Sequence, residues 1–465
     1  MSTVKICALV LTAAVACGGE WTRFRGPNGS GVAEGAKLPR EIGSGVNVVW
    51  KTGLPMGKSS PVVTADRIYL TGHESGRLYT LALDRTSGRI LWRRESPGYR
   101  DEKRNKLNDA AAPTPASDGA NVYVFFAGFG LLSYDRHGRE RWRRPLGPFT
   151  NFHGMAASPV VEAGKVFLVC DQDIEAYLLA VDQNTGKTIW RVERPEMVHS
   201  FSTPIVHRGE LIVPGSYQMY GYNLTTGALL WRVRGLTYQV KSGPVIGGNT
   251  LFFNGWAPGG EPSERIELPP FEEMLSGHDK DGDRMLSKTE VPKKWQPATW
   301  DMQDLNKDGL LDAKDWQYYR QRRTSSNATM AIHLGGRGDI IDTHVLWRYD
   351  KSLPDVPGVL LYRDVLYLVR NGGIVQSLEP GTGKVVKQGR LPNGLDEYYA
   401  SPVAGDGKVY LISRGGVVSV LEGGANWRVA ATGEMGEEVF ATPAIDDGHV
   451  WVRTSSALYD FAVPK

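Results

Sequence analysis

The chain has 465 residues, of which 41% are hydrophobic and 23% charged, as in ordinary globular proteins. Its 54 basic and 51 acidic side chains give a formal net charge of +3, so no nucleic-acid partner is indicated. The length would allow three domains, but an internal repeat favours one large ring over residues 20–465.

The N-terminal segment, residues 1–19, has the pattern of an export signal. One cation, Lys5, precedes an apolar run over residues 6–16 that is too short to span a membrane. Two alternatives remain for Cys17, which follows this run: plain export, or acylation that would anchor the protein to a membrane. We therefore expect a periplasmic or extracellular protein whose membrane contact would depend on a lipid at Cys17.

An aromatic and glycine-rich stretch, Trp21–Gly31, follows the signal. Its composition suits a leader that lies across the ring rather than a strand within it. Next comes Val48-Val49-Trp50, a short apolar segment with the character of a strand.

The rest of the chain repeats one pattern: Ser or Thr before Pro, a valine-rich strand, an Asp/Asn…Thr-Gly turn and a tryptophan. One copy runs from Ser158-Pro159 to Trp190 and predicts four short strands. The opening prolines are Pro61, Pro115, Pro159, Pro204, Pro244, Pro357, Pro402 and Pro443. The closing tryptophans are Trp92, Trp142, Trp190, Trp231, Trp347 and Trp427, with Lys387 in place of one in the sixth copy.

Most openings follow one another at about 40 to 54 residues, which is typical of four-stranded propeller blades. Eight openings predict an all-β, eight-bladed propeller. The last copy ends without its Thr-Gly turn and tryptophan, so we expect residues 46–51 to supply the missing strand. This pairing would close the ring and remove exposed sheet edges.

The repeat resembles that of the pyrroloquinoline-quinone-like (PQQ-like) propellers, with the pattern Ala-x-Asp-x-x-Thr-Gly-x-x-x-Trp. Residues Ala180 to Trp190 match it at every position. The leader is similar to one found ahead of some exported bacterial propellers of this family. The resemblance implies that each Thr-Gly turn joins the two outer strands and that each tryptophan docks between adjacent blades.

The turns that enter the innermost strand of each blade, here called entering turns, should lie on one face and surround the channel mouth. Four of their side chains are candidate ligand-binding residues: Lys58, His153, His199 and Lys241. Loops on a rigid scaffold are where binding residues collect, so these cations predict an anion or carboxylate site. The alternative is that they are solvated loop residues beside a water-filled channel.

The fifth copy is interrupted by an insertion, residues 262–325, that contains two EF-hand-like loops. Calcium takes six to eight oxygen ligands, and a twelve-residue loop with acidic positions 1, 3, 5 and 12 wraps them around one point. In the first loop the expected ligands are Asp279, Asp281, Asp283, the backbone carbonyl of Met285, and Glu290. Arg284 replaces the usual glycine at position 6, which predicts a strained loop.

The second loop has its glycine but ends in aspartate, so bidentate closure on the ion is in doubt. Its expected ligands are Asp304, Asn306, Asp308, the backbone carbonyl of Leu310, and Asp315. Prolines 292 and 297 shorten the helix between the loops, so the module should have little core and depend partly on the metal for folding. The insertion joins the second and third strands of its blade, and we therefore expect it to cover part of the channel mouth.

The family implies two different activities. Quinoprotein alcohol dehydrogenases hold PQQ and calcium at the axis beside a catalytic aspartate, and no residue here matches their catalytic motif. The eight-bladed lipoprotein of outer-membrane β-barrel assembly is a non-catalytic, protein-binding scaffold. The sequence therefore predicts an exported, calcium-binding scaffold for an unidentified protein or small molecule, with no assigned catalytic residue. The alternative is a PQQ-dependent periplasmic dehydrogenase of alcohols or sugars, with the four entering-turn cations holding the quinone carboxylates.

Overall fold

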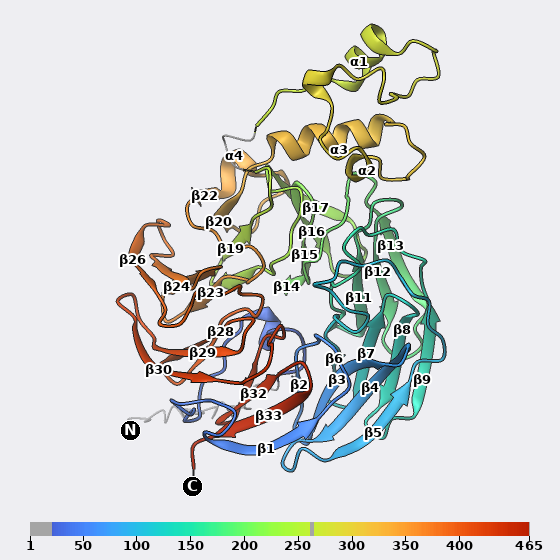
Figure 1. Cartoon of the computed structure of the whole chain (residues 1–465). Helices are drawn as coiled ribbons and strands as arrows, with labels where there is room; N and C mark the ends of the chain where they lie inside the picture. Colours follow the sequence, from blue (N-terminus) through green and yellow to red (C-terminus); the bar gives the residue numbers. More distant parts are fainter. Residues whose placement is uncertain (1–20, 261–264, 465) are drawn as a thin grey trace, which may run out of the picture.

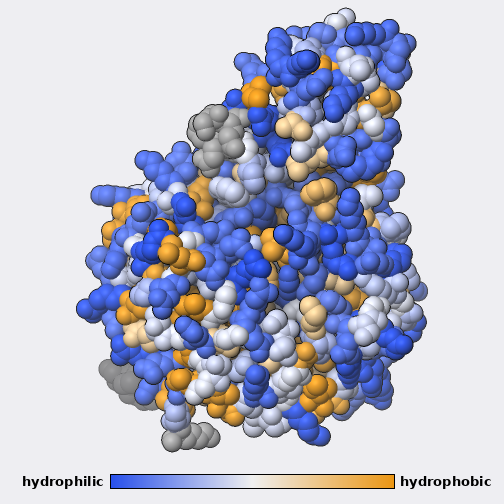
Figure 2. Space-filling view, in the orientation of Figure 1, coloured by the Kyte–Doolittle hydropathy of each residue, from blue (hydrophilic) through white to orange (hydrophobic). Residues whose placement is uncertain are grey.

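A computed structural model describes residues 21–260 and 265–464 of the chain. The predicted export signal and Cys17 lie outside the described residues. Eight separate sheets stand side by side around a central axis, which confirms the all-β, eight-bladed propeller (Figure 1). The small helical insertion projects from one edge of the ring (Figure 1 and Figure 2).

Each blade is an antiparallel sheet whose first strand lies innermost. Blades 1 and 2 contain β2 (Val62–Val63), β3 (Arg67–Glu74), β4 (Arg77–Asp84), β5 (Ile90–Glu95), β6 (Ala116–Ser117), β7 (Asn121–Phe126), β8 (Gly130–Asp135) and β9 (Glu140–Pro145). Blades 3 and 4 contain β10 (Val160–Glu162), β11 (Lys165–Cys170), β12 (Tyr177–Asp182), β13 (Thr188–Glu193), β14 (Ile205–His207), β15 (Glu210–Pro214), β16 (Gln218–Asn223) and β17 (Leu229–Arg234).

The second half of the ring has the same order. Blades 5 and 6 contain β18 (Val245–Gly247), β19 (Thr250–Gly255), β20 (Ala328–His333), β22 (Val345–Tyr349), β23 (Leu360–Tyr362), β24 (Val365–Arg370), β25 (Ile374–Leu378) and β26 (Val385–Arg390). Blades 7 and 8 contain β27 (Val403–Gly405), β28 (Lys408–Ile412), β29 (Val417–Glu422), β30 (Arg428–Glu434), β31 (Ala444–Asp446), β32 (His449–Arg453), β33 (Ala457–Ala462) and β1 (Val48–Gly53).

The burial of each strand follows from its place in the blade. Middle strands such as β11 and β12 are buried almost throughout, because each sheet packs between two neighbours, and this explains their continuous apolar runs. Outer strands such as β13 are mostly exposed, but Trp190 is buried between blades. Cys170, at the end of β11, is a free buried thiol.

The tryptophans dock between blades as the resemblance implied. Trp142 of blade 2 donates from its indole nitrogen to the carbonyl of Gln183, 3.0 Å away in the turn of blade 3. The same turn contains Gly186, whose φ is 69°, and a Cβ there would lie 2.7 Å from the Trp142 ring. The Thr-Gly turn therefore needs glycine both for its backbone conformation and for the neighbouring indole. Lys387 substitutes by donating to the Trp427 carbonyl at 2.6 Å.

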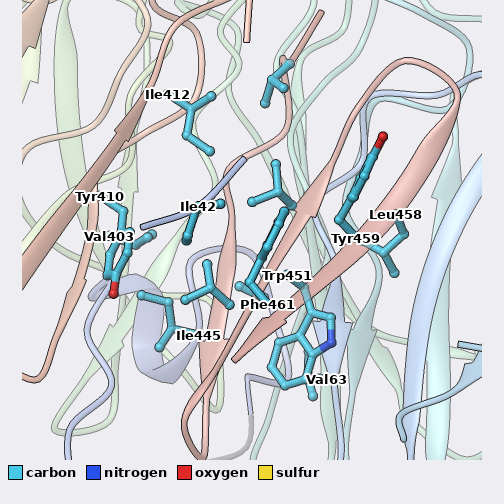
Figure 3. Close-up of a cluster of buried hydrophobic side chains, with 14 of the residues drawn as sticks. Ile42, Val63, Val403, Tyr410, Ile412, Ile445, Trp451, Leu458, Tyr459 and Phe461 are labelled. Atoms are coloured by element: carbon cyan, nitrogen blue, oxygen red, sulfur yellow. The ribbon is translucent and has the colours of Figure 1, made fainter. Parts of the chain in front are cut away.

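The ring is closed by the N-terminal strand, as predicted. β1 pairs antiparallel with β33, with Trp50 opposite Asp460, and so completes blade 8. A large hydrophobic cluster spans this junction and includes Trp451, Tyr459 and Phe461 (Figure 3). Ile42, from the segment before β1, packs into the same cluster (Figure 3).

The leader crosses the ends of the inner strands, on the face opposite the entering turns. Val63 of blade 1 donates to the Trp21 carbonyl, Ser117 of blade 2 to Thr22, and Ala404 of blade 7 to Gly31. The side-chain amide of Asn28 donates to the carbonyl of Val206 in blade 4 and accepts from the amide of the same residue. The leader thus ties opposite blades together and closes one end of the channel, in agreement with the segment expected across the ring.

Two elements depart from the regular blade. Strand β21 (Gly338–Asp339) and helix α4 (Ile341–His344) lie between β20 and β22, and β21 adds a parallel fifth strand to blade 4. The sequence did not indicate this strand, because the segment has no repeat counterpart. The insertion between β19 and β20 contains α1 (Phe271–His278), α2 (Trp300–Gln303) and α3 (Ala313–Thr324). No helix among residues 21–260 and 265–464 has the length and apolar character needed to cross a membrane.

Candidate functional site

The axial cavity, about 410 Å³ in volume, lies at the centre of the ring. Most of its lining comes from the entering turns, and Phe24 of the leader lies at the opposite end. The cavity is therefore open on the entering-turn face and closed by the leader. Aromatic side chains from several blades contribute to its wall: Phe201, Trp256, Tyr399 and Phe440.

The structure brings three of the four predicted cations to this cavity. Lys58, His153 and Lys241 line it, whereas His199 lies behind His153 with their ring centroids 5.7 Å apart. The Nδ1 atom of His199 is 2.5 Å from a carboxylate oxygen of Asp173. This bond to the neighbouring hairpin holds His199 outside the lining.

Both lysines already have partners. Lys58 donates to the Leu107 carbonyl at 2.6 Å and lies 3.8 Å from the centre of the Phe440 ring. Burial lowers the pKa of Lys58. Lys241 forms an ion pair with Asp355, which also lines the cavity.

His153 is held in its neutral form. Burial, followed by the nearby charges of His199 and Lys241, lowers its pKa to about 4. At neutral pH the ring therefore adds a hydrogen-bonding group to the cavity rather than a charge.

A ring of hydroxyl groups also lines the cavity, and the sequence analysis did not recognise it. The side-chain oxygen of Thr114 accepts from the Ser60 amide at 2.9 Å, and that of Ser158 accepts from the Thr114 amide at 3.0 Å. Thr203 and Thr442 accept from the amides of Ser158 and Ser401 in the same way. The signal was present in the repeat as the Ser or Thr directly before six of the eight opening prolines, a position that links neighbouring blades.

A second cavity, about 460 Å³, adjoins the first between blades 5 and 6. The two share Trp256 and Asp355. Asp350, Arg370 and Asn371 supply further polar groups. The candidate ligand site thus extends outward from the axis.

The inserted module has the geometry of a cation site in its first loop. One oxygen from each of Asp279, Asp281 and Asp283 lies within 4.8 Å of the other two. The two carboxylate oxygens of Glu290 accept from the amides of Lys280 and Ser287, each at 2.8 Å. These bonds hold the pKa of Glu290 near 2, so the carboxylate is ionised.

The second loop has the same construction. Asp304 accepts from the amide of Gly309 at 2.8 Å, and the two oxygens of Asp315 accept from Leu305 and Asp312. The loops are joined by reciprocal backbone bonds between Leu286 and Leu311, at 3.0 and 2.9 Å. The first loop therefore fits a divalent cation by geometry, and the second by the oxygen-bearing residue types at its ligand positions.

Arg284 adopts a φ of 62°, in the left-handed region that Gly309 occupies at the same position of the second loop. A non-glycine residue in this region costs about 1–2 kcal/mol. The predicted strain in the first loop is thus present in its backbone.

The module packs beside the channel mouth through α3. Lys314 donates to the Asp173 carbonyl at 2.6 Å, and the Tyr318 ring contacts that of His199, with centroids 5.9 Å apart. Tyr217 of blade 4 donates to the Tyr318 carbonyl at 3.2 Å. Among the described residues, none of the insertion lines the axial cavity; Trp256 and Pro258, which precede it, do. Helix α3 is held on blades 3 and 4, and the expectation that the module covers part of the mouth stays a prediction.

Comparison with known proteins gives a consistent result for the repeat. A family profile described as "Outer membrane protein assembly factor BamB" matches residues 43–173 and 80–255. BamB from Alkalilimnicola ehrlichii is 28% identical over 199 residues, which are 42% of this chain and 48% of that protein. The chain thus spans about half the length of this curated relative.

Solved structures match over nearly the whole ring. BamB from Moraxella catarrhalis has a TM-score of 0.56 at 11% identity, over 90% of this chain and 99% of the other. A europium-containing methanol dehydrogenase has a TM-score of 0.60 at 10% identity, over 96% and 98%. At this identity the likeness shows the fold alone. Together with the repeat, these matches identify the chain as an eight-bladed propeller built from PQQ-like repeats.

Proposed function

We propose that this protein is an exported, calcium-binding propeller that acts as an interaction scaffold, with the axial cavity as its ligand site. The observation that carries the proposal is the cavity itself, which is open on the entering-turn face and closed behind by the leader. Its titratable groups suit binding better than proton transfer. His153 is neutral and Asp355 is held in an ion pair with Lys241.

The similarity to outer membrane protein assembly factors supports a scaffold role, because assembly factors work by contact with other proteins. Export is supported by the sequence pattern of residues 1–19. A lipid at Cys17 would add a membrane anchor to the same scaffold.

Calcium binding is supported by the paired loops. Three carboxylates converge in the first, and Glu290 is held ready by two backbone amides. Burial raises the pKa of Asp315 to about 7, and a bound cation would offset the cost of its buried charge. In this proposal the ions stabilise the module, whose helix α3 contacts the ring.

The alternative is a PQQ-dependent dehydrogenase, favoured by the fold of its structural neighbours. The four cations expected to hold the quinone do not fit as a set. Lys241 is paired with Asp355, and His199 lies outside the cavity, bonded to Asp173. We therefore assign no step to a quinone.

The test combines metal and quinone titrations on the purified protein. We expect calcium to bind at two sites by calorimetry, with loss of one site in each of Asp279→Ala and Asp304→Ala. Addition of PQQ with calcium should give no saturable spectral change and no dye reduction with alcohols or sugars. Saturable PQQ uptake with turnover would establish the dehydrogenase instead, and absence of calcium binding would remove the metal from the proposal.

A further inference from the structure

The wall of the axial cavity contains several hydrogen-bond donors that have no acceptor among the described residues. Thr114, Ser158 and Thr203 each accept one backbone amide bond from the neighbouring blade. A hydroxyl that accepts one bond still has its own proton to donate. No acceptor in the described part of the chain takes these protons, nor that of Thr442. At least four hydroxyl donors thus remain available in the cavity wall.

The amide side chains add to these donors. The carbonyl oxygens of Asn105 and Asn108 already accept from the backbone amides of Leu107 and Asp109, at 2.9 and 2.8 Å. Their acceptor capacity is therefore partly used. The amino group of Asn105 has no protein acceptor among the described residues. An ammonium group has three donors, so Lys58, which makes one hydrogen bond, keeps two more.

The charged groups around the cavity are mainly positive, which also favours a ligand that accepts hydrogen bonds. Lys58 and Lys241 line it against one carboxylate, Asp355. Two buried arginines lie next to the lining. Arg25 follows Phe24, and Arg453 donates to the backbone and side-chain oxygens of Ser59, which precedes Ser60 in the wall. Neither arginine forms an ion pair within residues 21–260 and 265–464, and each is 1% exposed.

The guanidinium of Arg25 lies against Gly31 and Gly358, where a larger residue would contact it. Its Nη2 donates to the Val359 carbonyl at 2.7 Å, while Nε and Nη1 have no partner in the described structure. A Cβ on Gly358 would lie 2.4 Å from Nη1. A buried guanidinium without a carboxylate is costly by itself, and it makes the potential at the closed end more positive.

We propose that the axial cavity binds a carboxylate group, inserted from the entering-turn face toward the hydroxyl ring. A carboxylate accepts about four hydrogen bonds, and its negative charge would balance the surrounding cations. A neutral polyol would supply acceptors but leave the excess positive charge unmatched. The inference depends on the proposed function only in taking this cavity as the ligand site, and it is independent of calcium.

The carboxylate could belong to a free small acid or to the end of a polypeptide. Calorimetric titration of the whole protein at low ionic strength separates these sources. The probes are succinate, a Gly-Ser peptide with a free C-terminal carboxylate, and the same peptide amidated. Glycerol serves as the uncharged comparison.

We expect succinate or the free-acid peptide to bind, and glycerol and the amidated peptide to bind at least tenfold more weakly. Preference for succinate would identify a free acid, and preference for the peptide a polypeptide end. Lys58→Met should reduce the affinity at least tenfold. Lys165→Met changes a partly exposed lysine on the opposite face and should leave the affinity unchanged. Ser158→Ala, which removes one hydroxyl donor and no charge, should reduce it about threefold.

Equal binding of glycerol and succinate would overturn the proposal, as would absence of binding by both carboxylate probes. Unchanged affinity in both Lys58→Met and Ser158→Ala would also overturn it. If these results came from protein that still bound two calcium ions, the carboxylate site would fail while the calcium proposal stood.

Discussion

The ring and the inserted module obtain their stability in different ways. In the ring, each blade buries both faces against neighbours, and separate hydrophobic clusters fill the interfaces between blades. The module has one cluster of nine buried residues, around Trp300 and Trp316, and a first loop in which three carboxylates converge. A repeated interface tolerates local change, whereas a small core with concentrated negative charge depends on an ion.

The two regions contact each other through helix α3 of the module. Helix α3 of the module begins at the second loop, and its Lys314 and Tyr318 contact the hairpin and turn that contain Asp173 and His199. Behind this junction lies a buried ion pair of the ring, Arg194 with Asp171. The two regions should therefore respond separately to most changes and together only at this place.

The largest effect is expected at the buried ion pair. Arg194 makes two bonds to Asp171, at 2.7 and 3.0 Å, and both residues are almost fully buried. Asp171→Ala would leave the guanidinium unpaired and should lower the free energy of unfolding of the ring by about 3–5 kcal/mol. Urea unfolding monitored by circular dichroism measures this change.

A matched control is available in an exposed ion pair. Asp339 contacts Arg232 and Arg234 at the surface, so Asp339→Ala should cost less than about 1 kcal/mol. The double variant Asp171→Leu with Arg194→Met should recover much of the loss. Equal effects of the buried and exposed substitutions would mean that burial does not determine the cost.

Calcium removal should separate the module from the ring. With calcium at about 1,000 times its dissociation constant, binding stabilises the folded module by about 4 kcal/mol. Addition of EGTA should make residues 265–325 sensitive to protease while the unfolding midpoint of the ring stays unchanged. Simultaneous loss of both regions would show that the ring also depends on the ion.

The two loops should not be equivalent in this experiment. Asp304→Ala affects the loop that leads directly into α3, so it should also expose the Tyr318 contact with the ring. Asp279→Ala should leave that contact protected. Hydrogen exchange at residues 313–324 distinguishes the two variants. Equal protection would contradict the claim that the second loop alone controls the contact of α3 with the ring.

Within the ring, a third comparison tests the interface between blades. Gly186 and Gly164 both have positive φ, at 69° and 77°, but only Gly186 faces a neighbouring tryptophan. Gly164→Ala should cost only the backbone strain, about 1–2 kcal/mol. Gly186→Ala should cost about 1–3 kcal/mol more, because its Cβ would overlap Trp142. Equal unfolding free energies would show that the indole moves freely.

The regular parts of the molecule were predictable because they repeat. Eight openings gave eight blades, and a last copy without its tryptophan led to Trp50 and the closing strand. A repeat averages out local ambiguity, since each copy is evidence for the others. The leader was also placed correctly, from its lack of a strand pattern.

Single contacts between non-equivalent segments were not predictable. His153 and His199 occupy similar turns, yet only His199 meets a carboxylate, Asp173, from the adjacent hairpin. Strand β21 and the docking of α3 likewise depend on segments that occur once. The residues of the hydroxyl ring occur in six of the eight copies, but their role appears only when neighbouring blades are placed together.

The smallest predicted effect is the pH dependence of stability caused by His153, a residue of the propeller near its contact with the module. Its pKa of about 4 in the folded protein is below the value of about 6.5 expected in the unfolded chain. Between these values the unfolded state binds more protons, so stability falls as the pH drops from 6.5 to 4. The expected loss in the free energy of unfolding is about 1–2 kcal/mol, since partial exposure of the imidazole reduces the full effect. His153→Gln cannot take up this proton, so the difference in unfolding free energy between variant and wild type should change by that amount across the window. Parallel pH profiles would show that the imidazole is solvated at the open, entering-turn end of the channel.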